Sequence, residues 1–112
     1  MGRTEQNTVF GSELRTAILV AVYALEETHA SELARGLERS VSRIQTSLEG
    51  LEEAGLISSA MVGRTRRVRL NPRFFASTPL RELLSRLLEA DTSLLPRLAK
   101  LRKRPRRKGK GL

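Results

Sequence analysis

The sequence predicts a mainly α-helical fold with one small β-hairpin. Three observations support this prediction: a tight turn separates two short amphipathic segments, a glycine follows the second of them, and two strand-like segments come next. The chain has 112 residues and no cysteine, which suits one small domain without disulfides or thiolate metal sites.

The first helix is predicted over residues 13–26, after a polar segment, residues 1–11, that we expect to be flexible. Ser12 is a good N-cap because its hydroxyl can accept a hydrogen bond from a free amide of the first turn. Leu19 and Tyr23 widen the apolar face of this helix. We therefore expect burial on more than one side, either at the domain centre or against a partner.

A helix-turn-helix follows in residues 31–53. Ser31 is expected to cap a helix over residues 32–37, and Ser40 a second helix that stops at Gly55, since glycine readily adopts the left-handed conformation past a helix end. Helices joined by so tight a turn must cross steeply, so the second projects from the body. The apolar positions recur at helical spacing: Leu33, Leu37, Val41, Ile44, Leu48 and Leu51.

The polar face of the second helix is asymmetric. Its C-terminal half carries Glu49, Glu52 and Glu53, which phosphates would repel. Its N-terminal half carries hydroxyls, a guanidinium and an amide, which suit base edges and phosphates, as in a helix entering the major groove by its N-terminal end. The alternative is an ordinary solvated helix face. The candidate DNA-binding residues of this half are Ser40, Ser42, Arg43, Gln45 and Thr46.

The predicted hairpin joins strands at residues 56–62 and 66–70 through a turn at Gly63, which permits a positive φ. Val68 and Leu70 should face inward. Positive charge on an edge strand can simply deter aggregation, but four arginines within six residues exceed that need. We interpret the hairpin as a phosphate or minor-groove contact made by Arg64, Thr65, Arg66, Arg67 and Arg69.

The C-terminal region, residues 77–103, is predicted to form two leucine-rich helices. Thr78 caps the first, over about residues 79–91, and Pro96 fits the first turn of the second, with Thr92-Ser93 supplying the cap.

Nine leucines within 22 residues favour a two-fold homodimer whose recognition helices lie one DNA turn apart, roughly 34 Å. The alternative is that these leucines complete the domain's own core. The candidate dimer-interface residues are Leu19, Tyr23, Leu84, Leu87, Leu88, Leu95 and Leu98.

Positive charge is concentrated in two places. The net charge is +9; residues 100–112 hold eight basic groups and no acid, and residues 54–81 hold six arginines and no acid. This distribution is typical of a polyanion-binding protein. We expect residues 104–112 to be disordered. A basic tail can serve solubility alone, but here we favour sequence-independent phosphate contacts made by Arg102, Lys103, Arg104, Arg106, Arg107 and Lys108.

Other site classes find little support. His29 is the only histidine, in a Thr28-to-Ala30 connection that we expect to form a single bridging strand, and it lacks the partners of a metal site. The sequence contains no catalytic or cofactor-binding motif, so we predict no enzyme activity, no cofactor and no metal. No apolar run could span a bilayer, and the N-terminus lacks the apolar core of a signal peptide. We therefore expect no membrane partner and a cytoplasmic, nucleoid-associated protein.

Residues 12–72 resemble the winged helix-turn-helix regulators of bacteria and archaea, particularly the ArsR-like and MarR-like groups. The resemblance implies that residues 12–76 form a DNA-binding domain whose second motif helix reads bases and whose wing holds phosphates. Two departures stand out: Glu38 replaces a frequent glycine, and the cysteines or histidine-acid clusters of metal sensors are missing. The motifs that carry the resemblance are Leu33-Ala34, the Ser40/Ser42/Ile44/Leu48 spacing, Leu51-Glu52, Ala54-Gly55-Leu56-Ile57 and Gly63-Arg64.

These observations lead to one hypothesis and two alternatives. The hypothesis is a sequence-specific regulator that binds double-stranded DNA as a homodimer and represses transcription. The first alternative is a nucleoid-type architectural protein with little sequence preference, and the second is a winged-helix module that docks a protein partner.

Overall fold

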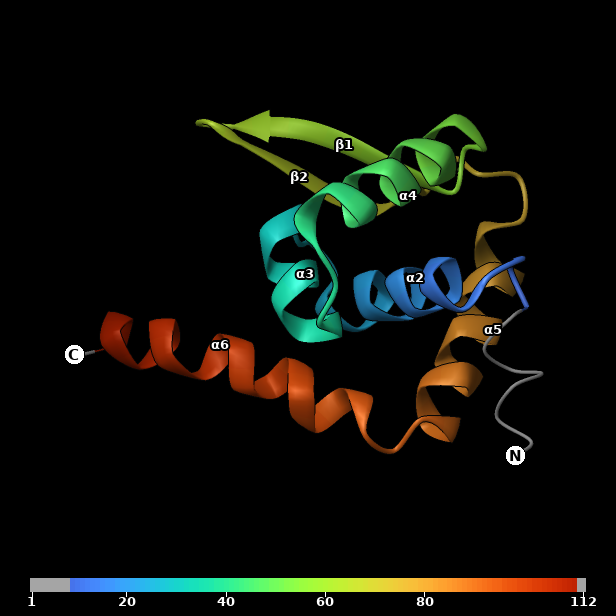
Figure 1. Ribbon diagram of the computed structural model, residues 1–112. Helices are drawn as coiled ribbons and strands as arrows, with labels where there is room; N and C mark the ends of the chain where they lie inside the picture. The colour runs from blue at the N-terminus through green and yellow to red at the C-terminus, as the bar shows by residue number, and fades with distance from the viewer. Residues whose placement is uncertain (1–8, 111–112) are drawn as a thin grey trace.

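The computed structural model describes residues 9–110, with side chains described for residues 9–102 (Figure 1). Five helices and one two-stranded antiparallel sheet occur in this part of the chain, in the arrangement of a winged helix-turn-helix. None of these helices is both long and apolar enough to cross a membrane. The elements are α2 (Glu13–Leu25), α3 (Ala30–Leu37), α4 (Val41–Glu53), β1 (Ile57–Val62), β2 (Thr65–Leu70), α5 (Ser77–Ala90) and α6 (Leu94–Lys110).

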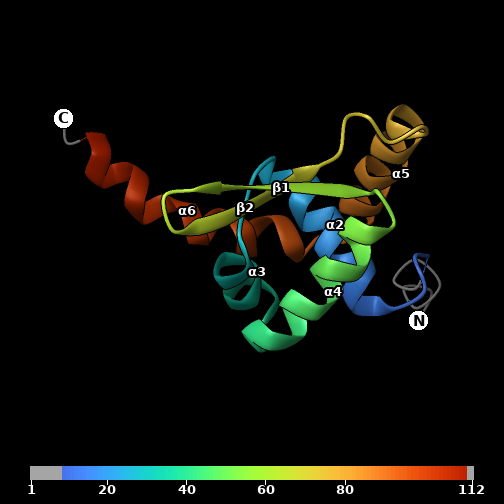
Figure 2. The ribbon, with the colours of Figure 1, turned by 90° about the horizontal axis from the view of Figure 1, so that it is seen from above.

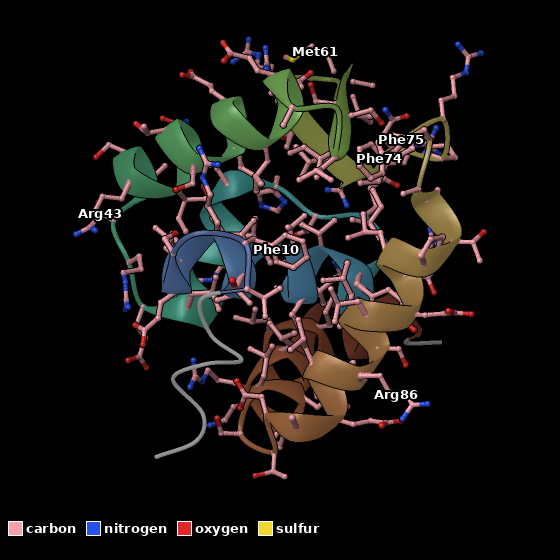
Figure 3. All side chains as sticks on the ribbon, turned by 90° about the vertical axis from the view of Figure 1, so that its right-hand side faces the viewer. Phe10, Arg43, Met61, Phe74, Phe75 and Arg86 are labelled. Atoms are coloured by element: carbon pink, nitrogen blue, oxygen red, sulfur yellow. The ribbon has the colours of Figure 1, made fainter. Side chains whose placement is uncertain are left out.

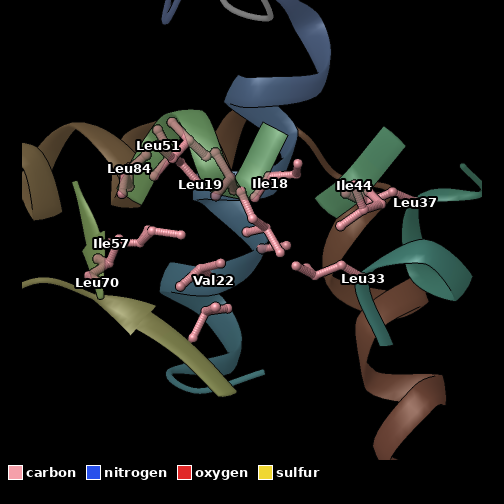
Figure 4. Packing of buried hydrophobic residues seen from close by; sticks show 14 of the residues in the cluster. Ile18, Leu19, Val22, Leu33, Leu37, Ile44, Leu51, Ile57, Leu70 and Leu84 are labelled. Carbon is pink, nitrogen blue, oxygen red and sulfur yellow. The ribbon is translucent and has the colours of Figure 1, made fainter. Parts of the chain in front are cut away.

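Helix α2 lies at the centre of the fold, in contact with every other helix and with β2. Its Ile18, Leu19 and Val22 are fully buried, and Figure 4 shows them among side chains from α3, α4, the hairpin and α5. The predicted burial on more than one side is confirmed. The predicted cap is confirmed too, because Ser12 Oγ accepts a hydrogen bond from Arg15 N at 3.0 Å.

The N-terminal segment is partly ordered against this core. Residues 1–8 lie outside the described residues, but Phe10 packs on the core and its amide donates to Thr16 Oγ1 at 3.3 Å. Within the segment predicted to be flexible, Phe10 therefore has its own contacts, and its aromatic ring covers apolar surface that α2 would otherwise expose.

The helix-turn-helix has the predicted second cap but not the first. Ser40 Oγ accepts from Arg43 N at 3.3 Å, and Gly55 takes φ 85° beyond α4. Helix α3 begins at Ala30, not at residue 32, with His29 at its N-cap and no side-chain cap. Ser31 is therefore the second residue of α3 and not its N-cap, and the first hydrogen bond of the helix runs from Leu33 N to the His29 carbonyl at 3.0 Å.

The turn between α3 and α4 contains Glu38, at a position where the winged helix-turn-helix regulators that the sequence resembles often have glycine. Glu38 adopts the left-handed conformation there, with φ 59° and ψ 51°, and its amide bonds back to the Ala34 carbonyl. Arg39 Nη1 donates to the carbonyls of Leu37 and Glu38, both at 3.3 Å. A non-glycine residue thus closes α3 in a backbone conformation that glycine adopts at lower cost.

One residue of the predicted apolar stripe does not belong to it. Ile44, Leu48 and Leu51 are at most 7% exposed, whereas Val41 is 40% exposed. Val41 is the first residue of α4 and lies about 60° around the helix from Ile44, on the edge of the buried stripe. No neighbouring turn of the same helix precedes it to complete its burial.

The hairpin pairs Ile57 with Leu70 at its base and Val62 with Thr65 at its tip. Thr65 therefore starts β2, and the turn is the two residues Gly63-Arg64, with Gly63 at φ 67°. Val68 and Leu70 are buried as predicted. The predicted bridging strand is confirmed as well, because Thr28 and Val68 exchange backbone hydrogen bonds of 3.0 and 2.8 Å.

Of the two C-terminal helices, only the first begins differently from the prediction. Helix α5 starts at Ser77, and Ala76 occupies the N-cap, so Thr78 is not a cap. The preceding loop already turns the chain, since Ser77 N donates to the Phe74 carbonyl at 3.0 Å. Before α6, Asp91 Oδ1 accepts from both the amide and the hydroxyl of Ser93, at 3.1 and 2.8 Å. Pro96 lies in the first turn of α6, as predicted.

Four of the leucines proposed for a dimer interface belong to the chain's own core. Leu19 and Leu84 are 0% exposed, Leu98 is 2% and Leu87 is 8%. Helix α6 packs closely on α3, because a Cβ added at Gly36 would lie 3.0 Å from Leu101 Cδ1 and 3.2 Å from Leu98 Cδ2. The alternative reading, in which these leucines complete the core, is correct for these four. Only Tyr23, Leu88 and Leu95 of the set retain exposed surface.

Helix α6 continues beyond the predicted boundary at residue 103. Its backbone is helical through Lys110, so the segment predicted to be disordered from residue 104 begins as helix. Lysine and arginine, which are good helix formers, dominate this segment, although it also contains Pro105 and Gly109. Figures 1 and 2 show this end of α6 extending past the rest of the domain. Residues 111–112 lie outside the described residues.

Candidate nucleic-acid interface

The N-terminal end of α4 presents all five side chains that the sequence assigned to the base-reading part of the interface. These five side chains are all exposed: Ser40, Ser42, Arg43, Gln45 and Thr46. Figure 3 shows Arg43 extending from α4 away from the body of the protein. Within the described residues Arg43 makes no ion pair, so its guanidinium has all its donors available to a ligand.

The hydroxyls of this half are organised along the helix. Ser42 Oγ lies 3.4 Å from Ser40 Oγ, and Thr46 Oγ1 donates to the Ser42 carbonyl at 3.1 Å. Because that bond uses its proton, the Thr46 hydroxyl faces solvent chiefly as an acceptor, next to its methyl group. Ser42 can still donate. The surface thus offers donors, acceptors and apolar groups within two helical turns.

The C-terminal half of α4 supports the hairpin instead. Glu52 accepts a hydrogen bond from Ser59 Oγ at 2.9 Å and lies 3.6 Å from Arg66 Nη1. Glu49 and Glu53 remain exposed. The acidic half therefore contacts the wing through Glu52, and it leaves the proposed contact surface to the N-terminal half.

The arginines of the hairpin fall into two groups. Arg66 pairs with Glu52, and Arg67 Nε lies 3.5 Å from Glu27 Oε2. Arg64 and Arg69 are exposed and form no ion pair within the part of the chain that the structure describes. Figures 1 and 2 show the hairpin projecting beyond α3 and α4, which carries Arg64 to its free end. Charge counted in the sequence is thus only partly available to a ligand.

Arg102, predicted as a phosphate contact of the tail, is instead an internal anchor. Its Nε and Nη2 bind both carboxylate oxygens of Glu32, at 2.7 and 2.9 Å, and Nη2 also donates to the Glu27 carbonyl at 2.7 Å. Glu32 is 6% exposed and accepts from Thr28 Oγ1 at 2.6 Å. The sequence could not indicate this internal role, because the buried carboxylate that requires a cation lies 70 positions earlier in the chain.

This network sets the ionisation of Glu32. Burial alone would raise the pKa of its carboxyl, but the hydrogen bonds from Arg102 and Thr28, together with the charge of Arg102, outweigh burial and hold that pKa below its ordinary value. Glu32 is thus a carboxylate that locks α6 onto α3. The other predicted tail contacts, Lys103, Arg104, Arg106, Arg107 and Lys108, have side chains outside the described part of the chain.

His29 lies beside this network and outside the proposed interface. Its Nδ1 is buried without a hydrogen-bond partner among the described residues. Burial lowers the pKa of the imidazole; Glu32 opposes this shift, and the nearby arginines reinforce it. Among the residues that the structure describes, no three histidine or carboxylate side chains are grouped to hold a metal ion.

One exposed residue of the surface was missed by the sequence analysis. Val41 stands between Ser40 and Ser42, and its spacing from Ile44 made it look like a core position. Its place directly after the cap could have identified it, because the first residue of a helix is only partly covered by its own helix.

Comparisons with known proteins agree with this fold. A family model described as HVO_A0114 matches residues 12–72. Two solved structures of point mutants of Lactococcus lactis ZitR are similar. The first shares 18% identity with a TM-score of 0.59, covering 80% of this chain and 60% of that one. The second shares 17% identity with the same TM-score, covering 92% and 70%.

The present chain therefore spans 60% of the length of the first ZitR chain, and at these identities the likeness concerns the fold. No curated protein matches the sequence.

Proposed function

The chain belongs to the HVO_A0114 family, and we propose that it is a transcriptional regulator that binds double-stranded DNA in a sequence-specific manner. In this proposal α4 enters the major groove by its N-terminal end, and the wing lies along the backbone or in the minor groove. An α-helix with its side chains is about 10–12 Å wide, which fits the major groove of about 12 Å.

The observation that carries the proposal is the exposed, polar N-terminal half of α4 beside a hairpin with free arginines. Arg43 can donate to guanine O6 and N7, and Gln45 can bind adenine N6 and N7, each in a bidentate manner. Arg64, at the tip of the wing, supplies a phosphate or minor-groove contact. Arg69 is exposed as well but lines the groove that also holds Tyr23, Leu88 and Leu95. Arg66 and Arg67 contribute less, because Glu52 and Glu27 already partner them.

The basic end of α6 adds sequence-independent contacts in this proposal. Lys103, Arg104, Arg106, Arg107 and Lys108 follow Arg102 along the helix that extends past the domain. Each phosphate neutralised on duplex DNA steepens the log-log salt dependence by about 0.9. The lock between Arg102 and Glu32 fixes where this basic segment begins.

We further propose that the protein acts as a homodimer. Tyr23, Leu88 and Leu95 line one surface groove, and Tyr23 and Leu83 line the next. Charged side chains, among them Glu26, Arg81 and Glu82, lie between these apolar groups. Leu83 is 38% exposed and Leu95 is 51% exposed. A second copy placed on this surface by a two-fold axis would bury them and repeat α4 along one face of the DNA. Repression then follows from occupation of a promoter by a nucleoid-associated dimer.

Selection from randomised duplex DNA tests the proposal directly. The full chain is incubated with the pool, and the bound fraction is sequenced. We expect enrichment of a pseudo-palindrome whose half-sites are about ten base pairs apart. Binding without enrichment would favour an architectural protein, and an absence of binding would favour a protein-interaction module; either result would contradict sequence-specific regulation.

Two substitutions provide the matching controls. Arg43→Ala and Gln45→Ala should each cost about 1–3 kcal/mol on the selected site and relax the preference at one position. Glu53→Gln changes an exposed residue at the other end of the same helix and should leave that preference unchanged.

A further inference from the structure

Val41 is the apolar side chain of α4 that the protein's own core leaves uncovered. It is 40% exposed, whereas the three apolar residues of the buried stripe in the same helix, Ile44, Leu48 and Leu51, are at most 7% exposed. Its place on the edge of the buried stripe accounts for the covered part of its surface. Helix propensity and capping do not account for the exposed part, since a β-branched residue is a mediocre helix former and Ser40 already provides the cap.

The neighbours of Val41 indicate what kind of surface it belongs to. Ser42 follows it directly, and Gln45 lies one helical turn further on, about 40° around the helix and about 6 Å along its axis. Residues four apart share a face, so Val41 and Gln45 present an apolar group and an amide side by side. An apolar protein partner that covered Val41 would also remove water from the polar side chains around it. Without hydrogen bonds from that partner, burial of these polar groups would cost free energy.

Base edges in the major groove offer both kinds of group at this spacing. Thymine is the base that presents an apolar group there, its 5-methyl, while adenine presents the N6/N7 pair that suits glutamine. Base pairs are stacked about 3.4 Å apart, so two side chains about 6 Å apart along a helix can reach neighbouring pairs.

We propose that Val41 is a specificity-determining residue that packs against the 5-methyl group of a thymine in the major groove. The inference rests on the proposed DNA-binding function and adds a named base to it. Each half-site therefore contains a thymine, near the position read by Gln45, whose methyl group contributes to affinity.

Removal of that methyl group from the DNA tests the inference without altering the protein. Duplexes carrying the site selected by the full chain are prepared with deoxyuridine in place of each thymine in turn. Deoxyuridine at one thymine of the half-site should lower the affinity of the wild-type protein about fourfold, the ratio expected when one methyl group is no longer buried. Deoxyuridine at the other thymines should change the affinity little.

The same measurements on Val41→Ala complete a thermodynamic cycle. This variant should bind the thymine duplex about fourfold more weakly than wild type, and it should show no further loss with deoxyuridine. Val62→Ala is the matched control, because Val62 is also an exposed valine, at 57%, but lies at the tip of the wing. It should keep the full response to deoxyuridine. Thermal unfolding confirms that each variant is folded.

The outcomes separate the inference from the function on which it rests. If wild type binds its selected site but responds to no deoxyuridine, or if Val41→Ala responds as strongly as wild type, Val41 does not read a thymine although sequence-specific binding stands. If no site is selected, the proposed function fails and the inference fails with it.

Discussion

Arginine has opposite roles on the two sides of α3. Towards α4 and the wing, Arg43, Arg64 and Arg69 are exposed and make no ion pair within the described residues. Towards α6, Arg102 binds both oxygens of the buried Glu32 and a backbone carbonyl. The comparison shows that only arginines without an internal ion pair have their charge available to a ligand. Four predictions follow from this difference, in order of decreasing effect.

The largest effect is expected from breaking the internal pair. Glu32→Ala leaves the Arg102 guanidinium and the fully buried Thr28 hydroxyl without their acceptor, and it should lower the free energy of unfolding by about 2 kcal/mol. The effect is limited because Arg102 keeps 34% of its side-chain surface and can be hydrated. Chemical denaturation measures this loss. The folded variant should retain the DNA preference of wild type; a lost preference with unchanged stability would reverse the assignment of the two regions.

Acid should weaken the same junction in two stages. His29 and Glu32 both have pKa values in the folded protein below their ordinary values of 6.5 and 4.5, so the unfolded chain binds protons more readily. The stability from His29 is complete above pH 6.5 and is lost as the pH falls through its folded pKa; that from Glu32 is complete above 4.5 and is lost below it. Thermal unfolding across this range should show both losses. His29→Gln should remove the loss of stability that begins near pH 6.5, and Glu32→Gln should remove the loss below pH 4.5. If neither variant changed the dependence of stability on pH, these two residues would not be its source.

Within the wing, free and paired arginines should differ. Arg64→Ala should reduce the slope of log affinity against log salt by about 0.9, the contribution of one phosphate contact. Arg66→Ala should reduce it by less, because Glu52 already lies 3.6 Å from its guanidinium and the substitution leaves that acid unpaired. Binding titrations at several salt concentrations compare the two variants. Equal slopes would show that internal pairing does not decide which arginines contact DNA.

The smallest effect is expected at the turn that joins the two regions. Glu38 has a φ of 59°, a conformation that costs a non-glycine residue about 1–2 kcal/mol. Glycine avoids this cost but loses more conformational entropy on folding, which cancels about half of the gain. Glu38→Gly should therefore raise the free energy of unfolding by about 0.5 kcal/mol. Glu26→Gly, at a second non-glycine position with a positive φ of 71°, should act in the same direction. A loss of stability in both variants would contradict this account of the backbone.

Features that depend on neighbouring residues could be predicted from the sequence. Ser12 and Ser40 are caps because a hydroxyl lies three residues before a free amide, and Gly63 marks a turn because the strands on either side alternate. Such signals also located the polar half of α4, whose spacing from the buried stripe fixes the direction in which it faces.

Features that depend on distant residues could not be predicted. The sequence places Arg102 in a basic run, and only the fold brings it to Glu32, 70 positions away. The leucines of α5 and α6 have the same spacing whether they meet a second chain or the core of their own chain, and Leu84 and Leu98 do the latter. Val41 has the spacing of a core residue but lies at the first position of its helix, where burial depends on tertiary neighbours.

The central claim is that the N-terminal half of α4 reads DNA sequence, and the ratio of two affinities tests it most directly. Binding of the full chain to its selected duplex and to a scrambled duplex of the same composition is measured for wild type, Arg43→Ala and Arg102→Lys. We predict that Arg43→Ala lowers the ratio about tenfold, through loss of one base contact, while Arg102→Lys leaves it unchanged. An unchanged ratio in Arg43→Ala would contradict sequence reading by α4.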